Sequence, residues 1–358
     1  MPMRITCLLL FVFIAFPAAR ADSVSDLVEQ GHYKRAEAAL RLQLQQNPND
    51  ALANCLMSKV DVAFARYDDA ISHAEKAVAI DGNSAQFHAQ LEDAYGSKSG
   101  DPNAGMFKKM AAARRMREEA EIALRLDPKN LDANEDLLEF YMEAPGIVGG
   151  GVDKAKELAT RAAGIDPALG YYLQAHIAKR EKHPEEAQRL LLQHVQAAPN
   201  RYDAFVELAD LYLNQTPPQF PQAEERARQA LRLDPLRVGA YTVLAALEAK
   251  QYHWRELDQV FSDSEKNIPD DLAPFYQVGK ILLLSGDGQQ LSRAESCFRK
   301  YLTQPPEAGK PSLAAAHWRL ALVLEKQGRK DEARGELQTA VKLDPNLKEA
   351  QQDLKRLK

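Results

Sequence analysis

Three consecutive glycines, Gly149, Gly150 and Gly151, stand just ahead of an alanine-rich segment with helical spacing, and Lys154 follows them. Glycine-rich loops before a helix can bind phosphate, because backbone N–H groups and the positive end of the helix dipole face the anion. A phosphate loop of the Walker type has glycine followed directly by Lys and Ser or Thr, and it follows a β-strand. Here Asp153 precedes the lysine, and no strand pattern precedes the loop. The residues therefore favour a long turn in which glycine permits positive φ.

The other residues that could do chemistry form no catalytic or metal-binding pattern. None of the eight histidines lies three or four residues from another, so no helix face presents two imidazoles to one metal ion. The chain has no Gly-x-Ser-x-Gly or His-Glu-x-x-His motif. Its carboxylates alternate with Lys and Arg, which is typical of solvated helix faces. We therefore expect a protein that is not an enzyme and has neither a metal site nor a cofactor.

The N-terminus has the features of a secretory signal peptide over residues 1–21. Arg4 is followed by the apolar run Cys7–Phe16, and Ala19–Ala21 supplies the small residues of a cleavage site. A run of about ten residues is too short for a helix that spans a bilayer. We expect cleavage after Ala21, a periplasmic or secreted mature chain and no stable membrane insertion, with a retained anchor as the alternative.

Charge and cysteine content restrict the partners and the source of stability. The 358 residues include 46 basic and 51 acidic side chains, and cleavage would remove two positive charges. An acidic chain argues against a nucleic-acid partner, because phosphate neutralisation requires a basic face. Cys55 and Cys297 lie far apart, whereas disulfide frameworks use more cysteines at closer spacing. We expect both to be buried as small hydrophobic residues.

Helix stops recur along the chain. Amphipathic, alanine-rich segments end at stops that are 32 to 46 residues apart, and most stops are Asp-Pro or a similar pair. Proline ends a helix because it lacks an N–H and clashes with the preceding turn. The stops are Pro48, Gly82, Pro128, Pro167, Pro199, Pro235, Pro269, Pro306 and Pro345.

Small residues recur in register with these stops. Ala294 and Phe298 precede Pro306 with A-x-x-x-F spacing, and Gly328 stands between two helical segments of the last unit. The pattern resembles the tetratricopeptide repeat family, whose 34-residue motif has W-x₂-L-G-x₂-Y, A-x₃-F and a final Pro. The resemblance runs from about residue 22 to residue 343. It departs from the motif where Phe or Tyr, as at Phe205, replaces the leading Trp.

This resemblance implies an all-α fold. We expect a right-handed α-solenoid of about nine tetratricopeptide-type helix pairs over residues 22–345, in which each pair buries its apolar face against its neighbours. Residues 346–358 are polar except for Leu347, Leu354 and Leu357, and we expect them to form a C-terminal capping helix.

Insertions lengthen the turn between the two helices of adjacent units. One covers residues 144–152, a second covers 95–107, and a third, 216–221, follows two units later. Insertions at equivalent positions of neighbouring repeats project from the same edge, where they bind ligands or are simply tolerated. The candidate residues of this edge are Tyr95, Phe107, Pro145, Gly149, Gly150, Gly151 and Lys154.

The first helix of each unit lines the concave groove in the tetratricopeptide repeat family. Mapped onto this chain, the middle of the groove is an acidic strip that would attract a basic partner. The Lys and Arg clamp by which some members bind C-terminal carboxylates is absent from these positions. The alternative is that the carboxylates only solvate the helices. The candidate residues are Asp93, Asp132, Glu135, Glu139, Asp203, Glu207 and Asp210.

Two functions follow from these patterns. The first is a non-enzymatic scaffold for protein–protein interaction, exported to the cell envelope, that holds a segment of another protein in the acidic groove. The segments around Tyr95 and Gly149 also resemble bacterial secreted repeat proteins, a likeness that implies no known activity. The alternative is a small-ligand-binding or enzyme-accessory protein that binds an anionic ligand at the loops 95–107 and 144–152.

Overall fold

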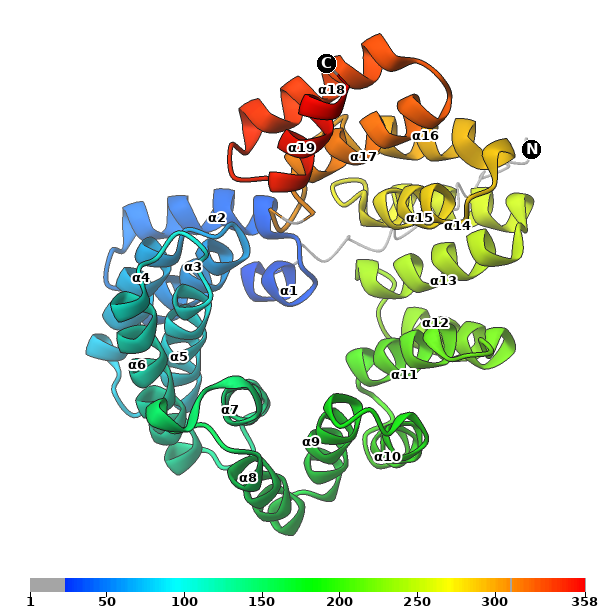
Figure 1. Cartoon of the computed structure of the whole chain (residues 1–358). Coiled ribbons are helices and arrows are strands. Elements are labelled where there is room, and N and C mark those ends of the chain that lie inside the picture. The colour runs from blue at the N-terminus through cyan, green and yellow to red at the C-terminus, as the bar shows by residue number, and fades with distance from the viewer. Residues whose placement is uncertain (1–22, 310, 358) are drawn as a thin grey trace, which may run out of the picture.

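The computed structural model describes residues 23–309 and 311–357, which form α-helices and two short 3₁₀ helices with no β-strand (Figure 1). The predicted signal peptide, residues 1–21, lies outside these ranges and stays a prediction. The first half contains α1 (Val24–Glu29), α2 (Tyr33–Gln46), α3 (Ala51–Ala63), α4 (Tyr67–Ile80), α5 (Ala85–Ser99), α6 (Met106–Leu126), α7 (Leu131–Glu143), η1 (Gly146–Val148), α8 (Val152–Ile165), α9 (Pro167–Arg180) and α10 (Pro184–Ala197). The second half contains α11 (Tyr202–Asn214), α12 (Phe220–Leu233), α13 (Val238–Gln251), α14 (Trp254–Asn267), α15 (Ala273–Leu284), η2 (Gly288–Gln290), α16 (Leu291–Tyr301), α17 (Leu313–Lys326), α18 (Lys330–Leu343) and α19 (Lys348–Arg356).

Local sequence accounts for where these helices begin and end. Side-chain oxygens of Asp50, Ser84 and Asn130 accept hydrogen bonds from the backbone N–H groups three residues later, which caps α3, α5 and α7. At the other end of a pair, α6 finishes directly before Asp127 and Pro128. The helix stops therefore fall between successive pairs, and the expectation of an all-α repeat array is confirmed.

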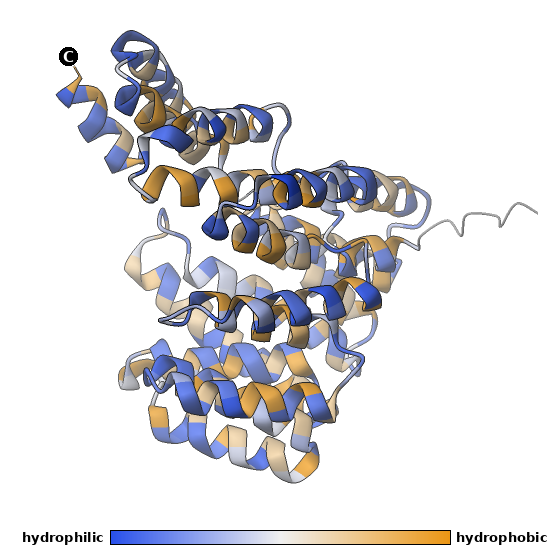
Figure 2. Cartoon of the chain, turned by 90° about the vertical axis from the view of Figure 1, so that its right-hand side faces the viewer, coloured by the Kyte–Doolittle hydropathy of each residue, from blue (hydrophilic) through white to orange (hydrophobic). Residues whose placement is uncertain are grey.

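Small residues let neighbouring helices approach closely. Ala223, Ala227 and Ala230 of α12 are all completely buried. A Cβ atom added at Gly279 would lie 3.0 Å from the ring of Phe298, which is itself fully buried. Consecutive helices contact each other along the chain, so α1 to α18 form nine pairs. Apolar residues follow the whole array instead of gathering in one central core (Figure 2).

The array curls until its N-terminal end meets a later part of the chain. Figure 1 shows α3, α5, α7 and α9 on the inner side of a ring and α4, α6, α8 and α10 on the outer side. At the junction, the Lys34 ammonium donates hydrogen bonds to the backbone oxygens of Asp270 (2.8 Å) and Pro305 (2.9 Å). Arg35 Nε contacts Asp270 Oδ2 at 2.7 Å. The sequence did not predict this closure.

The C-terminal helix α19 covers the last pair. Its edge packs Leu347, Leu354 and Leu357 against the core, and Trp318 Nε1 donates to Asp353 Oδ2 at 2.9 Å. Cys55 and Cys297 are buried free thiols, as expected, and burial raises the pKa of each to about 12. In the described ranges, no helix has the length and apolar character that crossing a membrane requires.

Candidate functional site: an acidic inner surface and a pocket between two insertions

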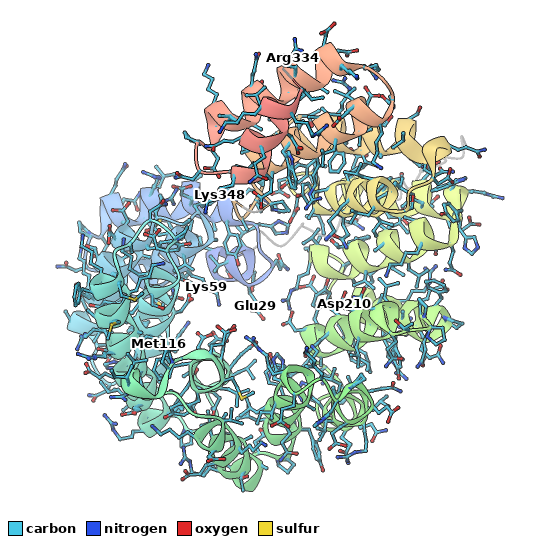
Figure 3. All side chains as sticks on the ribbon, viewed as in Figure 1. Glu29, Lys59, Met116, Asp210, Arg334 and Lys348 are labelled. Atoms are coloured by element: carbon cyan, nitrogen blue, oxygen red, sulfur yellow. The ribbon has the colours of Figure 1, made fainter. Side chains whose placement is uncertain are left out.

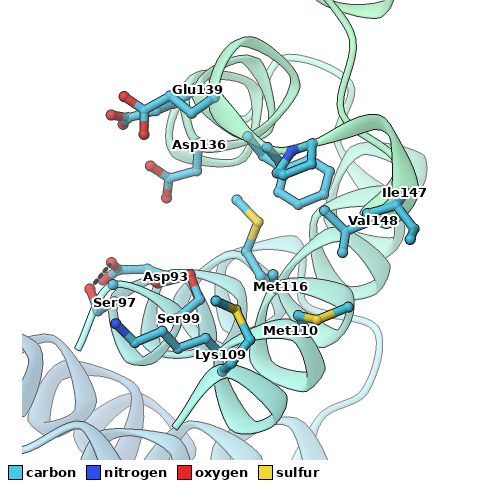
Figure 4. Close-up of a pocket in the computed structure, with 18 residues that line it drawn as sticks. Asp93, Ser97, Ser99, Lys109, Met110, Met116, Asp136, Glu139, Ile147 and Val148 are labelled. Carbon is cyan, nitrogen blue, oxygen red and sulfur yellow. Dashed lines mark hydrogen bonds between the residues drawn. The ribbon is translucent and has the colours of Figure 1, made fainter. Parts of the chain in front are cut away.

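The two insertions lie beside one pocket of about 690 Å³, between α5, α6, α7 and η1. One wall is apolar and the other is mostly acidic (Figure 4). Met106 and Ile147 at its mouth are 71% and 83% exposed, which is unusual for large apolar side chains. The apolar wall is formed by Met106, Met110, Met116, Phe140, Ile147 and Val148, and the polar wall by Asp93, Asp136, Glu139, Glu143 and Lys109.

This pocket changes the expected ligand chemistry. The sequence suggested an anionic ligand at the glycine loop, but the pocket is lined by four carboxylates and one ammonium, that of Lys109. Arg180 pairs with two of these carboxylates, Glu139 and Glu143, and the other two have no ion pair in the described residues. Negative charge in a partly enclosed site repels anions and attracts cations. Of the predicted edge residues, only Pro145 lines the pocket. The arrangement suits an apolar group that carries positive charge.

The glycine loop is a structural turn. Gly149 has a φ of +105° and Gly151 a φ of +155°, and a Cβ atom at Gly150 would lie 1.8 Å from the Ala144 carbonyl oxygen. Lys154 Nζ donates a hydrogen bond to the Gly149 oxygen at 2.7 Å. The lysine is therefore engaged within its own loop, which accounts for the residues that first suggested phosphate binding.

The sequence suggested that Tyr95 and Phe107 lie in a loop, but the structure places both of them in helices. Helix α5 continues to Ser99 and α6 begins at Met106, so the connecting segment is only residues 100–105. The extra residues of this unit extend the helices, because α6 reaches 21 residues. Tyr95 lies on α5 and donates its hydroxyl hydrogen to Glu75 Oε1 at 2.8 Å, while Phe107 is 89% exposed in the first turn of α6.

Several carboxylates of the predicted acidic strip have cationic partners on the inner helices. Asp203 pairs with Arg237 at 2.5 Å. Glu207 lies 2.5 Å from Lys179 Nζ and 3.0 Å from His176 Nε2. Burial would raise the pKa of Glu207, but these two partners lower it to about 2.

The ends of the strip are likewise satisfied. Arg180 contacts Glu139 at 3.3 Å and also pairs with Glu143. The Asn214 amide donates to Asp210 Oδ1 at 2.9 Å. Asp132 lies 3.8 Å from Lys59 Nζ. At these positions the carboxylates therefore already have a partner on their own or a neighbouring helix.

Four neighbouring carboxylates on α5 and α7 differ from the rest. Glu92, Asp93, Glu135 and Asp136, called the acidic cluster below, have no ion-pair contact within 4.0 Å in residues 23–309 and 311–357. Asp93 accepts a hydrogen bond from the Gln90 amide at 3.1 Å. Glu92 is completely buried, and its oxygens meet no N–H donor in the described part of the chain, so its hydrogen-bond partner is the carboxyl group of Asp136, which requires a proton on one of the two.

Burial and the repulsion between neighbouring carboxylates raise the pKa values of the acidic cluster. Burial raises the pKa of Glu92 well above its ordinary value, and the charges of Asp136 and Asp93 add to that effect. Burial and the charge of Asp93 likewise raise the pKa of Asp136 well above the usual range. Burial also raises the pKa of Glu135, and the hydroxyl of Tyr172 opposes it. These raised pKa values favour protonation of part of the acidic cluster as long as no cation enters it.

Sequence reasoning had included Asp93 and Glu135 and had missed their neighbours Glu92 and Asp136. A signal was present, because both segments contain a Glu-Asp dipeptide, in LEDA (91–94) and NEDL (134–137). The groove positions of the repeat family include only one carboxylate of each dipeptide, Asp93 on the first helix and Glu135 on the second. In the structure, the missed carboxylates also face the inter-helix space between α5 and α7.

The acidic cluster borders the inner side of the ring. Asp93 and Asp136 line both the 690 Å³ pocket and a smaller cavity of about 120 Å³ that also contains Lys59. A further cavity of about 450 Å³ spans α1, α3, α5 and α7 and reaches Arg201 and Arg237. Figure 3 shows Lys59 on the side of its helix that faces the centre of the ring. The inner surface is therefore hollowed and carries separated acidic and basic areas.

Comparison with known proteins identifies the repeat. Residues 314–347, which span α17, α18 and the turn after them, match the family model described as "Tetratricopeptide repeat". The crystal structure of yeast Tom70 aligns with a TM-score of 0.50 and 15% identity, and the alignment covers 93% of this chain and 79% of that chain. The chain folds as a tetratricopeptide repeat array.

Other tetratricopeptide repeat structures give weaker alignments. A thermophilic protein from Thermus thermophilus has a TM-score of 0.45 and 17% identity, over 53% of this chain and 95% of that chain. A protein from Parabacteroides merdae has a TM-score of 0.46 and 17% identity, over 74% of this chain and 98% of that chain. The search of curated proteins finds no match.

Proposed function

We propose that this tetratricopeptide repeat protein is a non-enzymatic scaffold that holds a positively charged segment of another protein on its inner surface. The observation that carries the proposal is the acidic cluster, whose four carboxylates have no ion pair within 4.0 Å in the described part of the chain, although Lys59 and His176 act on Asp93 and Glu135 from further away. A Lys or Arg side chain from a partner would supply the missing charge and hydrogen bonds in a site of low dielectric. Repeat arrays present extended concave surfaces of the kind that such a segment needs.

The proposed place of action is the cell envelope or the exterior. The support for this part is the apolar run Cys7–Phe16 and the cleavage pattern that follows it. The raised pKa values of the cluster fit binding because a cationic partner that enters would lower them again. The partner therefore binds more tightly as the pH rises and the cluster ionises.

The test compares three labelled peptides of equal length, one rich in Lys and Arg, one neutral and one rich in Glu, by fluorescence anisotropy. We expect only the basic peptide to bind, with affinity reduced about tenfold or more in Glu135→Gln and Asp136→Asn. The matched control is Asp331→Asn, whose side chain is 98% exposed on α18. Equal affinity for the basic and neutral peptides, or no difference between the cluster variants and the control, would refute the proposal.

The pocket between the insertions supports a second candidate, the binding of a small amphiphile. Its apolar wall and its four carboxylates together favour a short alkyl chain with a cationic head. Hexylamine should raise the melting temperature more than hexanol, and hexanoate should have no effect. Ile147→Ser should abolish the shift, while Leu284→Ser, at another exposed apolar position, should preserve it. Equal shifts with all three compounds would eliminate this candidate.

A further inference from the structure

The junction that closes the ring gathers three side chains from distant parts of the chain. His32 is the N-cap residue of α2, Asp270 lies between α14 and α15, and Glu307 lies between α16 and α17. Their ligand atoms, one nitrogen and two carboxylate oxygens, all lie within 4.8 Å of one another. Imidazole nitrogen and carboxylate oxygen are both common ligands of divalent transition metals.

These atoms are buried and lack hydrogen bonds. His32 is 1% exposed and Glu307 is 2% exposed. Neither ring nitrogen of His32 has a hydrogen-bond partner in the described part of the chain, and the same is true of Asp270 Oδ1 and Glu307 Oε2. A buried polar atom without a partner is destabilising, so several such atoms pointing at one place indicate that something else satisfies them.

One pair of these atoms has the separation expected of two ligands in a tetrahedral metal site. Zinc binds histidine nitrogen and carboxylate oxygen at about 2.0 to 2.2 Å, which places two ligand atoms about 3.3 to 3.5 Å apart. His32 Nδ1 and Asp270 Oδ1 are 3.4 Å apart. This separation fits two ligands of one ion, and the imidazole also acts on Asp270 directly, since it lowers the pKa of that carboxyl. The Glu307 oxygen lies within 4.8 Å of both atoms.

The other oxygen of each carboxylate is held from outside the cluster. Asp270 Oδ2 accepts a hydrogen bond from Arg35 Nε at 2.7 Å, and Glu307 Oε1 accepts one from the backbone N–H of Lys34 at 2.8 Å. Such contacts orient metal-binding carboxylates in proteins. The Lys34 ammonium, 3.0 Å from Glu307 Oε2, competes with an ion for that oxygen, although it is also bound to two backbone carbonyls.

We propose that His32, Asp270 and Glu307 bind a divalent transition-metal ion, with Zn²⁺ as the best match, that fastens α2 to the loops before α15 and α17. The ion would satisfy the unpartnered atoms of all three residues and join parts of the chain that otherwise contact through Lys34 and Arg35. Closure of the ring then depends on metal availability. The site is independent of the partner proposed for the acidic cluster.

The test uses the purified full chain after treatment with a chelator, titrated with ZnCl₂ by calorimetry. We expect one high-affinity Zn²⁺ per chain, and a Co²⁺-loaded chain should show the visible absorption of a tetrahedral site. His32→Ala and Glu307→Gln should each weaken binding about tenfold or more. The matched control is His183→Ala in the turn before α10, where the side chain is 63% exposed.

Two results would overturn the proposal. The first is no Zn²⁺ binding by the wild-type chain, which would leave the junction as an ion pair between His32 and Asp270. The second is undiminished binding in both ligand variants, which would place the ion elsewhere. Circular dichroism checks that each variant folds, and Glu307→Gln keeps the oxygen that accepts from Lys34. At equal concentrations, Zn²⁺ should also raise the melting temperature of the wild-type chain more than that of Glu307→Gln.

Discussion

Replacing the half-buried Asp136 by Asn should stabilise the protein at neutral pH. Burial raises the pKa of Asp136, the negative charges of Asp93, Glu135 and Asp132 add to that effect, and a hydrogen bond shared with Glu92 opposes it. A neutral amide has nearly the same shape, removes this repulsion and can donate a hydrogen bond to Glu92. We expect the free energy of unfolding at pH 7.5 to rise by about 1 to 3 kcal/mol, which is the usual cost of a polar group that is removed from water without full hydrogen bonding.

The effect should depend on pH with a defined sign. Near pH 3 the aspartic acid is protonated in both the folded and the unfolded chain, so Asp136→Asn changes stability little. As the pH rises above the ordinary pKa of aspartate, the unfolded chain releases its proton first, because the pKa of Asp136 is raised in the folded state. The folded wild-type chain is therefore progressively destabilised relative to the variant up to the raised pKa, above which the difference is constant.

The assay is urea unfolding followed by far-UV circular dichroism at several pH values between 3 and 8. Asp331→Asn is the control, since its exposed side chain should give a difference of less than about 0.5 kcal/mol at every pH. A variant that is less stable than wild type at pH 7.5 would show that Asp136 has a stabilising partner. A gain that is independent of pH would show that its source is packing instead of charge.

Three further perturbations test the architecture. Gly150→Ala should destabilise the chain by about 1 to 3 kcal/mol in thermal melts, because its Cβ would overlap a backbone oxygen, whereas Gly146→Ala has open space around it and should have little effect. Phe298→Ala should lower stability by about 3 to 5 kcal/mol, since the ring is fully buried, and Phe107→Ala, on an 89% exposed ring, should not. Lys34→Ala should increase the radius of gyration in small-angle X-ray scattering and speed hydrogen exchange in α2, because it removes two hydrogen bonds across the junction. An unchanged radius would mean that the remaining contacts are enough to hold the ring.

The features that the sequence predicted are those set by local physics. Proline stops, capping residues and buried alanines act within a few residues, so the period of the array and the ends of its helices could be read directly. The position of the 144–152 turn followed from that register, because α7 ends at Glu143. The extent of α5 and α6 could not be predicted from that register, because Gly96 stays helical where it packs near Met116.

The features that the sequence did not predict depend on distant segments. The curvature that brings Lys34 to Asp270 accumulates over many small rotations between units, and no single motif encodes it. The acidic cluster combines α5 with α7, and its charge excess depends on which carboxylates find an Arg or Lys on a neighbouring helix. The same non-local folding explains why histidine spacing gave no indication of the atoms gathered around His32.

The contact between Lys34 and Asp270 also changes how the molecule should come apart. In an open stack the first unit has a neighbour on one side only and frays before the others, because stability is a sum over nearest-neighbour interfaces. Here the first unit has neighbours on both sides, and the loop before α17 packs so closely that a Cβ atom added at Gly309 would lie 3.3 Å from the Ala63 carbonyl oxygen. The free end of this molecule is therefore its last pair with α19, and mechanical or thermal unravelling should start there.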